Sequence, residues 1–387
     1  MNIHTMSLNE SAYFGAGARA SLPAEIRRRG YQKALLVSDP ELVRVHVTEL
    51  VSKLLDEAGI PYALFAQVKP NPTIENVQAG VEAFSACGAD FLIAVGGGSP
   101  IDTAKAIGII VSNPEFADVR SLEGYGLTQR RSAPLIVLPT TAGTASEVTT
   151  TFVISDARAT KKMICGDPNC LPVLAILDPE LMLSMPRGLT AATGMDALTH
   201  AIEGYLTRGG WEMTDFLALR AIELIGRHLR AAVEQPANLE ARSGMALGQY
   251  TAGMGFANAG LGIVHSMSHP LGAHYDTPHG VANALLLPYV MEFNAPACGE
   301  KYRQIALALG HPEAGGLPLD GAVRTAVEAV RELAGAIGIP QKLSKIGVQR
   351  QDLDMLSEEA FRDVCTFGNP RDVSVADLRQ IYQQAFE

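Results

Sequence analysis

FLIAVGGGSPIDTAK, residues 91–105, indicates how the first half of this chain folds. Its five apolar residues, Phe91 to Val95, predict a buried strand, and the three glycines that follow turn the chain into a helical pattern. Ser99 suits the N-cap of this helix, Pro100 its first position and Asp102 a capping box. A strand that leads through a tight turn into a helix is the repeating unit of a parallel α/β sheet.

Apolar runs of strand length occur on both sides of this unit, at Ala34 to Val37, Tyr62 to Phe65 and Leu135 to Leu138. The segments Glu41 to Ala58 and Thr73 to Ala86 have helical spacing. Strands that alternate with helices predict a mostly parallel sheet with crossover helices. We therefore expect an α/β domain over residues 1–183.

Beyond Leu189 the pattern changes to helices separated by glycines. The segments with helical spacing are Leu189 to Leu206, Met213 to Ala232, Leu239 to Phe256, Pro288 to Phe293, Glu300 to Leu309, Ala322 to Ile337 and Val373 to Phe386. At 387 residues the chain exceeds the size at which one hydrophobic core stops growing. We predict a second, all-α domain over residues 184–387.

The composition restricts the class of protein. Hydrophobic residues make up 47% of the chain and charged residues 19%, as in a compact enzyme. A net charge of −10 argues against nucleic acid or an anionic membrane as the partner. The five cysteines form no C-x-x-C pair, which favours a reducing compartment. Residues 1–9 lack a secretory pattern, and no window approaches the roughly 18 apolar residues of a membrane span, so we expect a cytoplasmic protein.

The glycine turn at residues 96–98 predicts a phosphate site. Glycines without side chains let backbone N–H groups approach a pyrophosphate at the positive end of the following helix. Because the pattern is neither G-x-G-x-x-G nor a Walker loop, a purely structural turn is the alternative.

Two other strand ends carry polar groups suited to a nucleotide. Pro139 to Glu147 is rich in hydroxyl side chains and follows a predicted strand, where an open parallel sheet receives its ligand. Alternatively, Thr140 and Ser146 cap the next helix. Asp39 follows the strand at Ala34 to Val37, where a carboxylate can accept the ribose hydroxyls of NAD and repel a 2′-phosphate; an ordinary Asp-Pro turn is the alternative.

A metal site is predicted further along the chain. Asp196 and His200 are four residues apart in a segment without internal Pro or Gly, so they share one face of a helix. His265 and His279 come from a separate Gly-rich segment. One oxygen and three nitrogens suit Fe(II), Zn(II) or Mn(II) and can leave a position open for substrate. Alone, Asp196 and His200 could be a surface or capping pair, but the clustering of histidines favours a metal.

Four segments together resemble the iron-containing (group III) alcohol dehydrogenase family: Gly96 to Asp102, Pro139 to Thr144, Asp196 to Glu203, and His265 to His279. The resemblance spans almost the whole chain. It implies an α/β domain that binds a dinucleotide, an all-helical metal domain, and a cleft between them where the nicotinamide meets the metal, an architecture shared with dehydroquinate synthase. It also implies that Asp196, His200, His265 and His279 ligate Fe(II), although Zn(II) has the higher affinity for such ligands.

The same resemblance implies NAD(H) as the cofactor and a homodimer as the assembly. The cofactor positions that it carries over are Asp39, Asn71, Gly97, Gly98, Ser99, Asp102, Thr140, Thr141 and Lys162. In similar family members an N-terminal strand, here Ala12 to Gly15, pairs across the two subunits.

A narrower resemblance, at Asn113 to Gly124 and Ala246 to Tyr250, is to family members that interconvert lactaldehyde and propane-1,2-diol. It implies direct hydride transfer with Fe(II) polarising the substrate oxygen. A broader short-chain alcohol dehydrogenase or a propane-1,3-diol dehydrogenase is the alternative, because Phe367, where glycine is expected, Thr151 and His274 depart from these members. A dehydroquinate synthase-like lyase would need a cationic pocket, yet residues 253–280 contain no Lys or Arg. A non-catalytic NAD-binding or metal-sensing protein would not need the complete ligand set.

Side chains around the predicted metal are candidates for further roles. His269 lies four residues after His265, on the same face if this segment is helical, and can relay a proton between substrate and solvent. An orienting or packing histidine is the alternative. Phe256 and Leu261 are expected to wall a small apolar pocket, with Thr151 beside it, and Cys365 to approach the cofactor; core packing is the alternative for these side chains.

Overall fold

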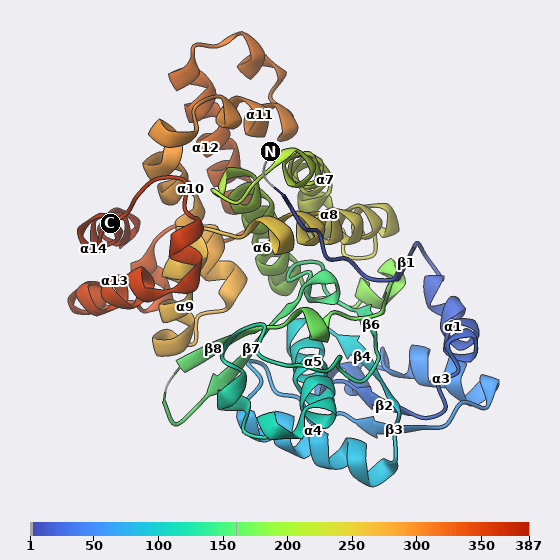
Figure 1. The fold of residues 1–387 in the computed structure, drawn as a ribbon. Coiled ribbons are helices and arrows are strands. Elements are labelled where there is room, and N and C mark those ends of the chain that lie inside the picture. Colours follow the sequence, from blue (N-terminus) through green and yellow to red (C-terminus); the bar gives the residue numbers. More distant parts are fainter. Residues whose placement is uncertain (1–2, 160, 387) are drawn as a thin grey trace. The chain divides into compact units, whose positions relative to one another are not determined.

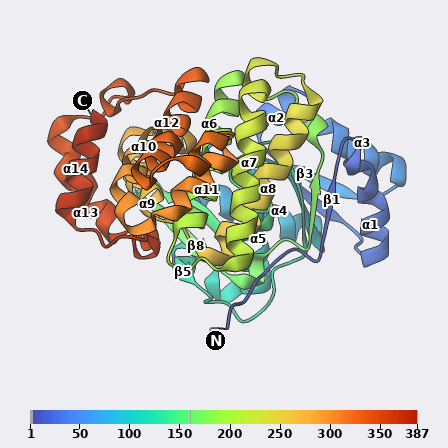
Figure 2. The same ribbon diagram turned by 90° about the horizontal axis from the view of Figure 1, so that it is seen from above.

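The computed structural model describes residues 3–159 and 161–386, which form two compact units. One unit contains the residues up to Thr141 together with Ala145–Met185, and the other contains Ala142–Thr144 together with the residues from Pro186 onward. The first unit, coloured blue to green in Figure 1, is α/β, and the second, yellow-green to red, is helical (Figures 1 and 2).

The α/β unit is built on a parallel sheet with the strand order β1-β9-β6-β4-β2-β3 among the described residues. These strands are β1 (Ser11–Phe14), β2 (Ala34–Val37), β3 (Tyr62–Phe65), β4 (Phe91–Gly96), β6 (Leu135–Pro139) and β9 (Leu174–Leu177). Every pairing in it is parallel, which confirms the predicted sheet. The central strands β2, β4 and β6 are buried along their whole length, so their sequences are continuous apolar runs.

Helices cover both faces of this sheet. They are α1 (Leu22–Arg29), α2 (Pro40–Arg44), α3 (Glu49–Ala58), α4 (Ile74–Cys87) and α5 (Gly98–Ser112). Alternate strand residues point to opposite faces: Leu35 packs in the core beneath α4 and α5, and Leu36 packs with residues of α1 and α3. The predicted continuous helix over Glu41 to Ala58 is wrong, because the chain takes a left-handed turn at His46 (φ 61°) that ends α2.

A second, small sheet follows β6 and was not predicted. It contains β5 (Gly124–Tyr125), β7 (Thr151–Asp156) and β8 (Lys161–Gly166). β7 and β8 pair antiparallel, and β7 alternates between half-buried and buried residues. One face of this hairpin therefore packs on the core.

The second unit is helical, as predicted. Its helices are α6 (Arg187–Leu206), α7 (Glu212–Glu234), α8 (Leu239–Ala259), α9 (Ile263–Tyr275), α10 (His279–Cys298), α11 (Glu300–Ala308), α12 (Leu319–Ala336), α13 (Leu353–Arg362) and α14 (Val375–Phe386). Two of them, α9 and α13, were not predicted. The segment predicted at Pro288 to Phe293 is part of the longer α10, which continues through Pro288 and Pro296. Helix α10 packs against both α6 and α9, and these three helices carry the site.

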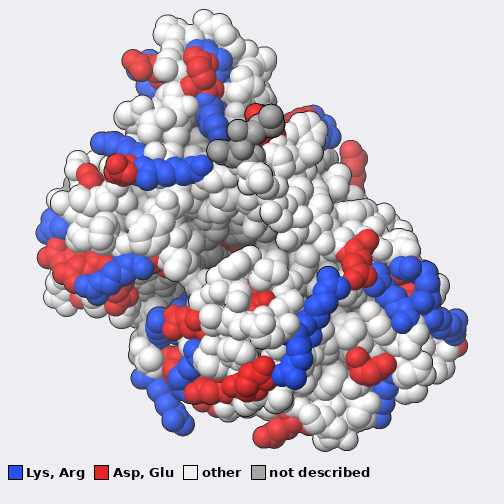
Figure 3. Space-filling view, in the orientation of Figure 1, with Lys and Arg blue, Asp and Glu red and all other residues white. Residues whose placement is uncertain are grey.

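Acidic and basic side chains are interspersed on the face shown in Figure 3. Many such charges are paired, for example Arg227 with Glu223 on α7. Exposed pairs of this kind contribute little to stability. Within the described ranges, no helix combines the length and the apolar character needed to cross a lipid bilayer.

Candidate active site

Three helices of the second unit bring predicted metal ligands together. Asp196 lies in the middle of α6, His265 in the first turn of α9, and His279 at the first position of α10. One ligand atom from each of these residues lies within 4.8 Å of the other two. The Asp196 Oδ1 atom is 3.7 Å from the His279 Nε2 atom. Asp196 and His265 are buried, and His279 is half-buried, so the group is reached from the side of His279.

Gly280 permits this convergence. A Cβ atom at Gly280 would lie 2.1 Å from the carbonyl oxygen of Ala192 and 3.2 Å from the Cβ of Asp196. Both neighbours belong to α6, so the bare glycine lets the first turn of α10 lie against that helix. His279 is thereby held opposite Asp196.

His200, the remaining predicted ligand, lies next to this group. Its ring stacks on His265 with centroids 4.6 Å apart, and on Phe256 with centroids 4.2 Å apart. Its buried Nδ1 atom has no hydrogen-bond partner among the described residues. An imidazole buried without a partner is costly unless a ligand satisfies it.

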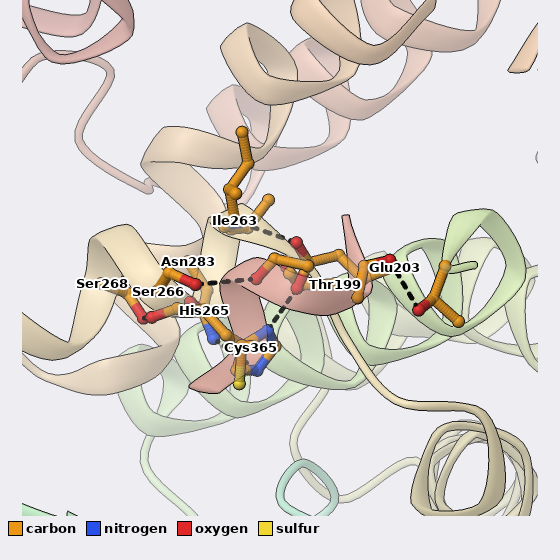
Figure 4. A network of polar contacts seen from close by, with 12 residues as sticks. Thr199, Glu203, Ile263, His265, Ser266, Ser268, Asn283 and Cys365 are labelled. Carbon is orange, nitrogen blue, oxygen red and sulfur yellow. Dashed lines mark hydrogen bonds and ion pairs between the residues drawn. The ribbon is translucent and has the colours of Figure 1, made fainter. Parts of the chain in front are cut away.

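Glu203 fixes the orientation of His265. One carboxylate oxygen lies 2.5 Å from His265 Nδ1 (Figure 4). The other accepts the backbone N–H of Val264 at 2.7 Å. Burial raises the pKa of Glu203 to about 7 and lowers that of His265 well below its ordinary value. The imidazole is therefore neutral, with its Nδ1 proton directed to Glu203 and its Nε2 lone pair directed to the group of ligand atoms.

His269 is held in a similar way by a residue distant in the sequence. Its Nδ1 atom lies 2.7 Å from Asp363 Oδ2, and Asp363 Oδ1 accepts the backbone N–H of Cys365 at 2.9 Å. Burial raises the pKa of Asp363, but the neighbouring His269 and Cys365 outweigh this effect, and the pKa is lowered overall. The His269 ring stacks on that of His279, with centroids 5.5 Å apart. The contact with Asp363 engages Nδ1 of His269 and leaves the Nε2 atom available to other partners.

The side-chain amide of Asn283, one turn after His279 on α10, contacts all three ligand atoms. Its Nδ2 atom lies 2.8 Å from Asp196 Oδ1, 3.2 Å from His265 Nε2 and 3.1 Å from His279 Nε2. The fully buried Oδ1 atom has no hydrogen-bond partner among the described residues. A carboxylate oxygen and imidazole nitrogens that converge on one point form a donor set suited to a divalent transition metal.

In the α/β unit, the glycine turn begins helix α5. Gly97 is the N-cap and makes no side-chain capping bond, so the predicted N-cap role of Ser99 is wrong: Ser99 lies inside the helix. The capping box at Asp102 is wrong as well, because its half-buried carboxylate accepts hydrogen bonds from Ser146 Oγ and Val153 N. A Cβ atom at Gly97 would lie 3.0 Å from the Thr141 side chain. The bare backbone therefore starts the helix directly beside the second predicted loop.

The remaining predicted cofactor residues follow strands of the six-stranded sheet, except for Lys162, which lies on β8 of the small sheet. Lys162 Nζ donates to Asn71 Oδ1 at 3.1 Å, which pairs two of them. Asp39 caps α2, since its Oδ1 accepts the N–H of Leu42, and burial raises its pKa. The backbone N–H of Thr140 donates to the carbonyl of Gly96.

Models of one family match both halves of the chain. The model described as "Iron-containing alcohol dehydrogenase" matches residues 9–179. The model described as "Fe-containing alcohol dehydrogenase family, C-terminal" matches residues 190–386. The chain belongs to the iron-containing alcohol dehydrogenase family. It is an oxidoreductase, as its sequence predicted.

This dehydrogenase is similar to relatives along nearly its whole length. It is 53% identical to lactaldehyde reductase from Escherichia coli (strain K12) over 381 residues, which cover 98% of this chain and 99% of the relative. It is 42% identical to 1,3-propanediol dehydrogenase from Citrobacter freundii, with 97% and 96% of the two chains covered. Among solved structures, a 1,3-propanediol oxidoreductase superposes with a TM-score of 0.97 at 40% identity and covers each chain fully.

The residues predicted for the substrate pocket of this dehydrogenase lie in different surroundings. Phe256 stacks on His200, and the carbonyl of Leu261 closely approaches Gly368. The carbonyl of Thr151 accepts a hydrogen bond from the buried amine of Lys105. Burial raises the pKa of the Cys365 thiol well above its ordinary value, so the thiol is not ionised at neutral pH. Their contribution to a pocket stays a prediction.

Sequence analysis missed several residues that organise this site. Glu203 and Asn283 could have been found, since they follow His200 by three residues and His279 by four on the same helices. Asp363 gave no local signal, because it lies 94 residues beyond His269.

Proposed function

We propose that this dehydrogenase interconverts lactaldehyde and propane-1,2-diol with NAD(H) as the hydride donor and acceptor. The observation that carries the proposal is the convergence of Asp196, His265 and His279 beside the oriented His269–Asp363 pair. The identity with lactaldehyde reductase over almost the full length of both chains supports the substrate.

We infer that Asp196, His200, His265 and His279 hold Fe(II). The buried Nδ1 atom of His200 has no hydrogen-bond partner among the described residues, which supports His200 as the fourth ligand. Coordination of a metal would give this imidazole the partner that it lacks. When bound, Fe(II) acts as a Lewis acid on the substrate oxygen and stabilises the negative charge that develops there. The protein contributes a single carboxylate and neutral imidazoles, so the centre keeps a net positive charge.

His269 supplies the proton in the reducing direction. NADH, when bound, would supply the hydride to the carbonyl carbon, and His269 Nε2 would pass a proton to the carbonyl oxygen. Asp363 holds the Nδ1 proton and so leaves Nε2 as the exchanging position. In the oxidising direction the proton transfer is reversed, and His269 would pass the hydroxyl proton of the substrate to solvent.

The glycine turn and the strand ends hold the dinucleotide. N–H groups in the first turn of α5 carry no side-chain cap and can donate to the pyrophosphate. Asp39 suits the ribose hydroxyls and disfavours a 2′-phosphate, which supports NAD over NADP. Asp102 contributes indirectly, because its carboxylate accepts a hydrogen bond from Ser146 and so holds the adjacent loop.

We also propose a cytoplasmic homodimer. Strand β1 lies at the edge of the six-stranded sheet formed by the described residues, and Phe14 is 48% exposed there. A second copy that pairs along this edge would cover the outer side of β1 and the aromatic ring. Sedimentation velocity would give a dimer mass, and a monomer at micromolar concentration would contradict the proposal.

A propane-1,3-diol dehydrogenase is the second candidate, supported by the 1,3-propanediol relatives and by their superposition on this chain. Steady-state kinetics with NADH and either lactaldehyde or 3-hydroxypropanal separates the two. We expect kcat/KM to be at least about tenfold higher for lactaldehyde, an amount that corresponds to about 1.4 kcal/mol of transition-state binding. The reverse order would favour the second candidate.

A further inference from the structure

Lone pairs directed to one place repel one another unless a hydrogen-bond donor or a cation lies among them. Asp196 Oδ1 is an acceptor only. His265 donates its Nδ1–H to Glu203 and therefore carries a lone pair on Nε2. Ser268 Oγ donates to the carbonyl of His265 and so faces His279 Nδ1 as an acceptor at 3.4 Å. His279 is then also protonated on Nδ1 and presents an Nε2 lone pair. A hydrogen-bond donor or a cation among these atoms, which lie within 4.8 Å of one another, stabilises the arrangement.

The Asn283 amide is that group. Because Asp196 can only accept, the amide must direct Nδ2 toward it, and its partial positive N–H groups then lie 2.8 to 3.2 Å from all three ligand atoms. The carbonyl Oδ1 points away and has no partner among the described residues. A buried carbonyl oxygen without a hydrogen-bond partner costs free energy. The contacts of Nδ2 with the three ligand atoms offset this cost.

We propose that Asn283 is an internal stand-in for the cation, which holds the ligand atoms of Asp196, His265 and His279 together in the metal-free protein and yields the two histidines to the metal when it binds. The proposal rests on the metal centre of the proposed function. Asn283 is thus a positioning residue: it stabilises the formed site before loading, and it competes with the metal for the same lone pairs.

The first test substitutes Asn283 by leucine, which has a similar shape and no polar atom. In the metal-free variant the three ligand atoms lose the Nδ2 donor of Asn283, whereas the zinc-loaded variant loses at most the bond to Asp196. The melting temperature should therefore fall more without zinc than with it. The zinc dissociation constant, measured by competition with a chelator, should become about fivefold lower, because a net hydrogen bond contributes about 1 kcal/mol. An unchanged or weaker zinc affinity would overturn the proposal.

Asn283→Asp gives a second, independent reading. It keeps the size of the side chain but replaces the donor by a carboxylate. At pH 8 the metal-free protein should be destabilised further, and the zinc-induced rise in melting temperature should exceed that of Asn283→Leu. A rise equal to that of the wild type would overturn the proposal. If metal-free Asn283→Leu does not fold, Asn283→Ala replaces it, because water can enter the space left by the side chain and act as a donor. This variant should show the same increase in zinc affinity, but a smaller one.

Asn294→Leu is the matched control. Asn294 is buried on the same helix and exchanges hydrogen bonds with Asn369, away from the ligand atoms. Its loss should lower the melting temperature equally with and without zinc. A wild-type protein that shows no zinc-induced shift would instead contradict the metal centre itself, so failure of the two proposals can be told apart.

Discussion

Asp363 Oδ2 lies 2.7 Å from His269 Nδ1, although 94 residues separate the two in the sequence. Asp363 begins the short 3-10 helix Val364–Gly368, where its other oxygen accepts the N–H of Cys365. The carboxylate is thus fixed by the backbone on one side and fixes an imidazole on the other. This relationship links the proposed proton relay to a loop near the end of the chain.

Asp363→Asn should lower kcat by about 10- to 100-fold, part of the 10²–10⁴ that acid–base catalysis contributes. The amide cannot accept from both His269 and the Cys365 N–H, so the imidazole loses its fixed orientation. Steady-state kinetics should show little change in the KM for NADH, and bound metal should stay at the wild-type level. Asp372→Asn, which removes an exposed partner of Arg208, is the control and should leave kcat unchanged. Equal losses in the two variants would exclude the positioning role.

Glu203→Gln should weaken metal binding by about 10- to 100-fold, as is typical for groups that orient a ligating histidine. Its amide would place N–H groups against either His265 Nδ1 or the Val264 N–H, which are both donors to Glu203. The metal dissociation constant from chelator competition measures the effect. Glu359→Gln, at the exposed His274–Glu359 pair, should have no effect on this constant. A wild-type constant for Glu203→Gln would contradict the role given to Glu203.

Gly280→Ala should lower the free energy of unfolding by about 1–3 kcal/mol, the range for overpacked sites, and should also reduce metal retention. The added methyl group would force α10 away from the Ala192 carbonyl and separate His279 from Asp196. Gly188→Ala on α6 is the control, because nothing lies within 4 Å of its Cβ position. There alanine should be neutral or stabilise by up to about 1 kcal/mol. If both variants retain metal equally, the close approach at Gly280 does not form the site.

Stability between pH 2 and pH 5 should depend on Glu25. Hydrogen bonds from Arg28, Tyr13 and Arg29 lower its pKa from 4.5 to about 2, against the opposing effect of burial. A carboxylate with a lowered pKa stabilises the fold above its unfolded value of 4.5, and this contribution is lost as the pH falls toward 2. Urea unfolding should show Glu25→Gln to be less stable by about 1–2 kcal/mol at pH 7, after allowance for solvent screening. The difference should shrink below pH 4; a constant difference would show that charge is not involved.

Local patterns predicted the sheet and part of the site for physical reasons. The buried strands are uniformly apolar, and Asp196 and His200 share one turn of a helix, so both signals lie within a few residues. Three errors have local causes. The left-handed turn at His46 falls inside a continuous apolar pattern, and α10 continues through Pro288.

The third error, the capping role of Ser99, arose because glycine and serine both serve as N-caps. Contacts between distant segments had no such signal: nothing near His269 indicates Asp363, and nothing near Asp196 indicates that Asn283 will face it. These relationships depend on the packing of α6, α9, α10 and the loop after α13.

Anaerobic oxidation of NADH with lactaldehyde, by protein stripped with a chelator and then given Fe(II), tests the central claim most directly. The account predicts loss of activity on stripping and recovery with Fe(II), with no recovery in Asp196→Ala. Full activity after complete removal of metal would contradict it, as would an absence of activity in metal-loaded wild-type protein.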